Sequence, residues 1–105
     1  MLGIGKWQAE VKNMFFSGKA ILEIKDDGGK YGMNLELPDS DLEIPEINII
    51  SAEEDGNTLL AKAEVSLLPG KEIDVNITFD GDVCNGFLKV PFVGKIKISN
   101  AAKIG

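Results

Sequence analysis

The chain contains no histidine and no arginine, and all 11 of its basic residues are lysines. Histidine is the usual general base near neutral pH, and arginine is the usual bidentate partner of carboxylates and phosphates. Their absence excludes histidine-dependent catalytic triads, zinc–histidine sites and arginine fingers within a single chain. We therefore expect a protein that is not an enzyme, with no catalytic residues, no metal site and no cofactor.

Cysteine and long apolar runs are scarce as well. Cys84 is the only cysteine, so no intrachain disulfide forms, and we expect a buried, inert thiol in a strand. No segment approaches the run of about 18 to 20 apolar residues that a transmembrane helix needs, so we expect no membrane span. The first residues lack a charged start followed by an apolar stretch, so we expect no secretory signal and a cytoplasmic location.

The net charge of −6 argues against a nucleic-acid partner, because phosphate binding needs a concentrated basic face. The acidic residues gather instead in short polar stretches, such as 39–43 and 53–55. None of these stretches has the spacing of a calcium-binding loop, and Asp-Gly turns explain them without a metal. The 105 residues suffice for one domain, residues 1–105, with one hydrophobic core.

Glycine-containing turns recur at short intervals, and the segments between them alternate apolar and polar residues. The clearest segment is "EIDVNITF" (72–79), where Ile73, Val75 and Ile77 face one way. The pattern predicts about eight strands. Their expected ranges are 6–12, 19–25, 30–37, 43–50, 58–67, 72–79, 83–91 and 93–99. Short connections favour antiparallel neighbours, and closing the sheet removes its edges. We therefore predict an all-β, antiparallel up-and-down barrel, with a two-sheet β-sandwich as the alternative.

Gly5-Lys6-Trp7 opens the first predicted strand, and "DGGK", "DGNTL" and "DGD" turns follow it. This layout resembles the calycins, the group of lipocalins and fatty-acid-binding proteins. It is similar in particular to a small bacterial calycin-like β-barrel of unassigned function. The resemblance implies a barrel with its tryptophan at one end. Fatty-acid-binding proteins use interior arginines and a helical lid, and this chain has no arginine and only a short link between Asn13 and Gly18.

The predicted barrel interior is almost wholly apolar, so any ligand inside it should be a small apolar molecule. Small residues there either leave a cavity or accommodate large neighbours in a filled core, and the sequence leaves both open. A bulge at Gly32 would shift the alternation, so the direction of Tyr31 stays open too. The candidate ligand-binding residues are Trp7, Met33, Ala61, Ala63, Phe79, Cys84 and Gly86.

Four phenylalanines are expected outside the core, at Phe15, Phe16, Phe87 and Phe92. If several of them share a face, they form an interaction surface for a homodimer or for another partner. The alternative is that Phe15 and Phe16 fold back and close one mouth of the barrel. The sequence thus supports two functions of different kinds. One is a non-enzymatic barrel that binds a small apolar ligand, and the other is a structural or protein-interaction module with a filled core.

Overall fold

The computed structural model describes residues 2–12, 17–39, 47–65, 72–90 and 94–105, and all of its regular elements are strands. The described strands number eight. They are β1 (Gly5–Lys12), β2 (Ser17–Asp27), β3 (Lys30–Glu36), β4 (Ile47–Asp55), β5 (Thr58–Val65), β6 (Glu72–Asp80), β7 (Val83–Val90) and β8 (Gly94–Lys103). None of the described residues forms a helix with the length and hydropathy that crossing a bilayer requires.

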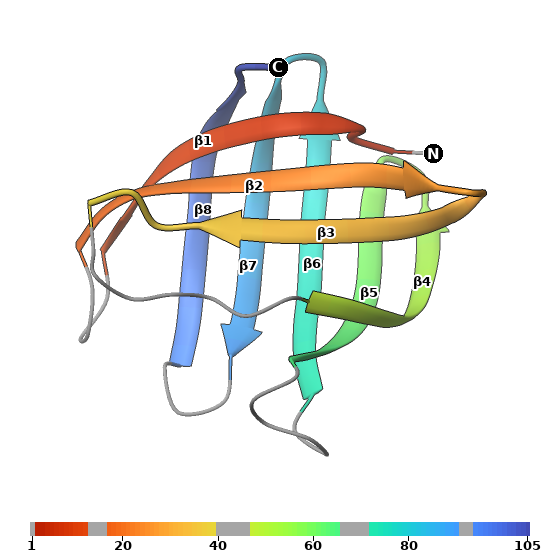
Figure 1. Cartoon of the computed structure of the whole chain (residues 1–105). Helices are drawn as coiled ribbons and strands as arrows, with labels where there is room; N and C mark the ends of the chain where they lie inside the picture. The colour runs from red at the N-terminus through yellow and green to blue at the C-terminus, as the bar shows by residue number, and fades with distance from the viewer. Residues whose placement is uncertain (1, 13–16, 40–46, 66–71, 91–93) are drawn as a thin grey trace.

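Each strand pairs antiparallel with the next, and β1 pairs with β8 at Trp7↔Lys103 and Gln8↔Ala102 to close the barrel. The predicted up-and-down barrel is therefore confirmed, and the two-sheet alternative is wrong. In Figure 1, β1, β2 and β3 cross the front of the molecule, while β5 to β8 run behind them at a steep angle. The barrel is flattened, with a shortest dimension of 19 Å for the Cα trace.

Because apolar and polar residues alternate along the strands, the apolar side chains line the inside of the barrel and the polar ones lie on its outside. Ile73, Val75 and Ile77 are buried as predicted, and no polar or charged residue is buried in the described part of the chain. Turn chemistry is also as expected: Gly28 and Gly29 have positive φ, and Gly29 N donates a hydrogen bond to Asp26 Oδ1 at 2.8 Å.

Most strand boundaries fall within two residues of the prediction, but two strands end well beyond their predicted limits. β4 extends to Asp55 rather than to residue 50, and residues 43–46 lie outside the described part. β8 extends to Lys103 rather than to residue 99. Asn100 has a left-handed φ of 50° near a register shift between β7 and β8, so the alternation breaks there and resumes with buried Ala101.

Candidate functional site

Most of the predicted ligand-binding residues lie in the hydrophobic core, and Met33 also lines a cleft in the barrel wall. Six of them are buried: Trp7, Met33, Ala61, Ala63, Phe79 and Cys84. Trp7 and Phe79 pack with their ring centroids 5.2 Å apart. The space beside Trp7 and Cys84 measures about 10 Å³, which suffices for at most about one water molecule. This part of the interior therefore has no room for a small-molecule ligand.

Gly86, the seventh predicted residue, does not line a ligand cavity. It pairs with Ile77 of β6, and a side chain added to it would meet the β6 backbone. Its role is to let β7 approach β6 closely.

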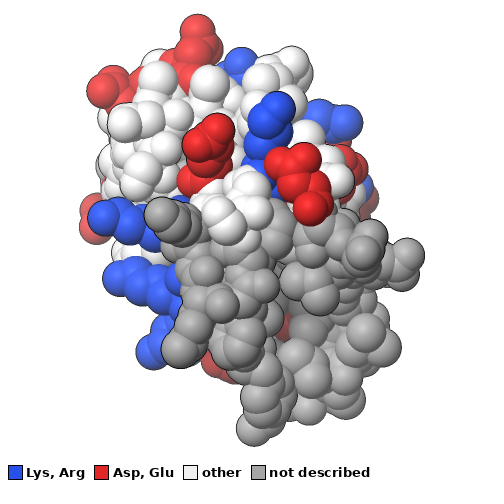
Figure 2. Space-filling model, turned by 90° about the vertical axis from the view of Figure 1, so that its left-hand side faces the viewer, with Lys and Arg blue, Asp and Glu red and all other residues white. Residues whose placement is uncertain are grey.

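Of the four predicted surface phenylalanines, Phe15, Phe16 and Phe92 lie outside the described residues. Phe87 is half-buried, and Lys95 Nζ lies over its ring, 4.4 Å from the centroid. Phe87 also pairs with Lys97, while Lys89 pairs with Lys95, so lysines surround the ring. Lysine side chains gather along one edge of the molecule in Figure 2. Phe87 thus lies beneath a cation rather than on a bare apolar patch.

The barrel wall is open between β3 and β4. Most neighbouring strands pair over long ladders, but among the described residues β3 and β4 pair only at Met33↔Ile47. The register of β4 on β5 shifts between Ile49 and Ser51, which marks a bulge. A bulge bends its strand, so β4 leaves β3 and continues beside β5, as Figure 1 shows.

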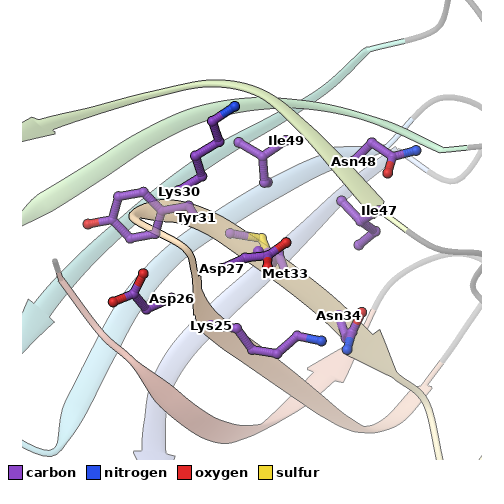
Figure 3. Close-up of a pocket in the computed structure, with 11 residues that line it drawn as sticks. Lys25, Asp26, Asp27, Lys30, Tyr31, Met33, Asn34, Ile47, Asn48 and Ile49 are labelled. Atoms are coloured by element: carbon purple, nitrogen blue, oxygen red, sulfur yellow. The ribbon is translucent and has the colours of Figure 1, made fainter.

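This divergence leaves a cleft of about 370 Å³ between the two strands, here named the β3–β4 cleft. Figure 3 shows Ile47, Asn48 and Ile49 projecting from β4 on one side, and side chains of β2 and β3 on the other. The lining residues are Lys25, Asp26, Asp27, Lys30, Tyr31, Gly32, Met33, Asn34, Ile47, Asn48 and Ile49. The volume falls within the range of about 300–1,000 Å³ typical of small-ligand sites.

The cleft combines apolar and polar chemistry. Met33 and Ile47 are buried at its base, and Tyr31 and Ile49 are half-buried. Lys25 and Lys30 are exposed, and neither has an ion-pair partner among the described residues. The result is an apolar floor below a rim of ammonium, carboxylate and carboxamide groups.

Tyr31 spans one end of the gap. Its hydroxyl donates a hydrogen bond to Glu54 Oε1 of β4 at 2.7 Å and accepts one from Leu2 N, also at 2.7 Å. The sequence left the direction of Tyr31 open. The ring packs against the core with its hydroxyl at the rim, and the described register shifts lie in β4 and β7 rather than at Gly32. Burial and the hydrogen bond to Glu54 raise the Tyr31 pKa above its usual 10.0.

We expect Tyr31→Phe to lower the free energy of unfolding by about 1 kcal/mol, because it removes both hydrogen bonds and keeps the ring. The raised pKa means that the contribution of the hydroxyl is present below pH 10.0 and is lost as pH rises through the folded-state pKa. Urea unfolding of both proteins near neutral pH and above pH 10.0 measures this. Equal stabilities near neutral pH would show that the Tyr31–Glu54 contact contributes nothing.

Other chemistry is sparse in the described residues. Burial raises the pKa of the Cys84 thiol to about 11, so the reactive thiolate is rare at neutral pH. No group of three or more acidic or cysteine side chains lies close enough to hold a metal ion within the described ranges.

Sequence reasoning missed the cleft. The available signal was the adjacent pair Ile49-Ile50, which a period of two cannot place on one face and which coincides with the bulge in β4.

No family model and no curated protein sequence matches the chain. Among solved structures, the chain is similar to the crystal structure of secretory abundant heat soluble protein 4 from Ramazzottius varieornatus. The TM-score is 0.56 and the sequence identity 17%, and the match covers 100% of this chain and 99% of that chain. At this identity the likeness shows the fold alone, without bearing on a bacterial origin. The fold that the two chains share agrees with the closed antiparallel barrel that the calycin resemblance implied.

Proposed function

We propose that the protein is a non-enzymatic binding module that holds a small amphipathic molecule in the β3–β4 cleft. The observation that carries the proposal is the cleft of about 370 Å³ in the wall of the barrel, where the described parts of β3 and β4 share a single paired position. The part of the core beside Trp7 and Cys84 has no room for a ligand, which supports placing the ligand in the wall.

The lining supports an amphipathic ligand. An apolar part would lie against Tyr31, Ile47 and Ile49. An anionic or hydrogen-bonding group would face Lys25 and Lys30, whose ammonium groups have no ion-pair partner among the described residues. Asp26 and Asp27 also line the cleft, so the anionic group would lie nearer the two ammonium groups than these carboxylates. The lack of histidine and arginine supports the non-enzymatic part of the proposal.

Gly32→Leu tests the site by filling it. The atoms nearest to a Cβ atom at Gly32 would be Lys25 Cβ at 3.6 Å, Asp27 Cβ at 3.7 Å and Lys25 Cε at 3.9 Å, which are ordinary contacts, so the position accepts a side chain. The probe is 1-anilinonaphthalene-8-sulfonate, which has aromatic rings and one anionic group. We expect the wild-type protein to bind it with enhanced fluorescence, and Gly32→Leu to weaken binding at least about tenfold, or about 1.4 kcal/mol.

Ala102→Leu is the matched control, because Ala102 is an exposed strand residue outside the cleft. This variant should bind the probe as the wild type does, and both variants should keep the wild-type unfolding midpoint. Equal probe binding by Gly32→Leu and wild type would contradict the cleft as the binding site.

A further inference from the structure

β4 has one paired edge and one free edge along most of its length. It pairs with β5 from Ile47 to Asp55, but with β3 at Ile47 alone. In the ranges that the structure describes, no strand pairs with Ile50–Asp55 on the β3 side. Closing a barrel normally removes such edges, and an unpaired edge presents N–H and C=O groups to any extended chain.

The core-facing side of this free edge is also uncovered. Ala52 lies opposite Ala61 and Glu54 lies opposite Leu59, and both of those β5 residues are buried. Ala52 and Glu54 are nevertheless exposed, because β3 has diverged and no longer covers them. The hydrogen bond from the Tyr31 hydroxyl to Glu54 spans the gap from β3. Among the described residues, no strand therefore covers the core-facing side of β4 beside this edge.

The negative charge of the free edge indicates what kind of chain could pair with it. Glu53, Glu54 and Asp55 are consecutive exposed acids, and β4 contains no lysine. Two copies of this edge would place like charges together, which disfavours pairing between identical molecules. Ile50, at the bulge, is 53% exposed and provides an apolar contact at the other end of the edge. The complementary chain is extended and carries lysines.

We propose that the free edge of β4, Ile50–Asp55, accepts a lysine-bearing extended peptide as an added strand. Backbone hydrogen bonds to β4 hold the peptide, and its lysines face Glu53 and Asp55. The edge adjoins the β3–β4 cleft through the hydrogen bond from Tyr31 to Glu54, but none of Ile50–Asp55 lines that cleft.

The test titrates the full-length, nitrogen-15-labelled protein with a capped peptide of alternating lysine and valine, matched in length to Ile50–Asp55. We expect amide shifts and slowed hydrogen exchange at Ile50–Asp55. The double variant Glu53→Gln/Asp55→Asn should weaken binding by about threefold to tenfold, as expected for the loss of two exposed ion pairs. Asp80→Asn/Asp82→Asn, at the end of β6 and in the turn that follows it, is the matched charge control and should bind normally.

The same peptide with alternate backbone nitrogens methylated separates strand pairing from simple charge attraction. It keeps the lysines and loses backbone donors, so it should not protect Ile50–Asp55. Equal binding by the methylated peptide would overturn the proposal. So would peptide-induced shifts confined to residues outside β4, or concentration-dependent protection of this edge without peptide, which would identify a second copy as the occupant. The fluorescent probe of the cleft reports independently of all these outcomes.

Discussion

Replacing Gly86 with alanine is expected to destabilise the barrel by more than about 4 kcal/mol, because the position has no room for a methyl group. A Cβ atom there would overlap the carbonyl oxygen of Asn76 and lie 2.7 Å from the Cα of Ile77. Both atoms belong to the backbone of β6, so neither moves aside as a side chain would. Domains of this size have about 5–15 kcal/mol of stability, and this loss removes a large share of it.

The local geometry explains the crowding. The register between β7 and β8 shifts between Cys84 and Gly86, and the side-chain oxygen of Asn85 accepts a hydrogen bond from Asn100 N at 2.8 Å. This irregular stretch of β7 faces β6 at Ile77↔Gly86, where only a glycine fits.

Urea unfolding followed by Trp7 fluorescence measures the effect of Gly86→Ala. Gly32→Ala is the control, because its new methyl group would make only ordinary contacts with Lys25 and Asp27. The control should change stability by no more than about 0.5 kcal/mol. A wild-type midpoint for Gly86→Ala would mean that β6 and β7 are not as close as the structure places them.

The sequence predicts the barrel well because its strands obey one local rule. In β6, each apolar residue at every second position is buried, so alternation alone identifies the core side. The rule fails where the backbone leaves regular geometry. At Asn100 the φ of 50° resets the alternation, so the last residues of β8 and buried Ala101 escape a period-two pattern.

The candidate cleft is harder to predict because it arises from a missing interaction. Each of β3 and β4 has an ordinary strand sequence, and only their mutual register shows that they pair at Met33↔Ile47 and then separate. Pairing between strands is a non-local property. The adjacent apolar residues Ile49 and Ile50 indicate a bulge, but they do not show which neighbouring strand is lost.

The packing of the interior follows from shape as well as composition. Small interior residues such as Ala9 and Ala20 are equally consistent with a cavity or with large neighbours. In the flattened barrel the two walls face each other closely, and packed sheets stand only about 10 Å apart. Trp7 and Phe79 pack together in that space, and Ala9 and Ala20 lie with Trp7 around a void of only about 10 Å³. The sequence gives the side-chain volumes of the interior residues, but the three-dimensional shape of the barrel determines whether those side chains fill the interior.

Replacing Trp7 with alanine is expected to cost about 3–5 kcal/mol, the range for deleting a large buried aromatic side chain. Trp7 is 3% exposed and packs on Phe79, and its Nε1 donates a hydrogen bond to Gly3 O at 2.8 Å. Gly3 lies directly against the Phe79 ring, so the tryptophan ties the start of the chain to the core. Far-ultraviolet circular dichroism during urea unfolding measures the loss without the tryptophan signal.

Trp7→Phe separates the two contributions. It keeps an aromatic ring beside Phe79 and removes the hydrogen bond to Gly3. We expect it to lower the free energy of unfolding by less than Trp7→Ala does, and to speed hydrogen exchange at the amides of the first residues. Glu10→Ala, at an exposed position of β1, should change stability by no more than about 0.5 kcal/mol. If Trp7→Ala cost as little as Glu10→Ala, the core would not depend on Trp7. That result would contradict tight packing around Trp7, and with it one reason for placing the ligand in the β3–β4 cleft and not inside the barrel.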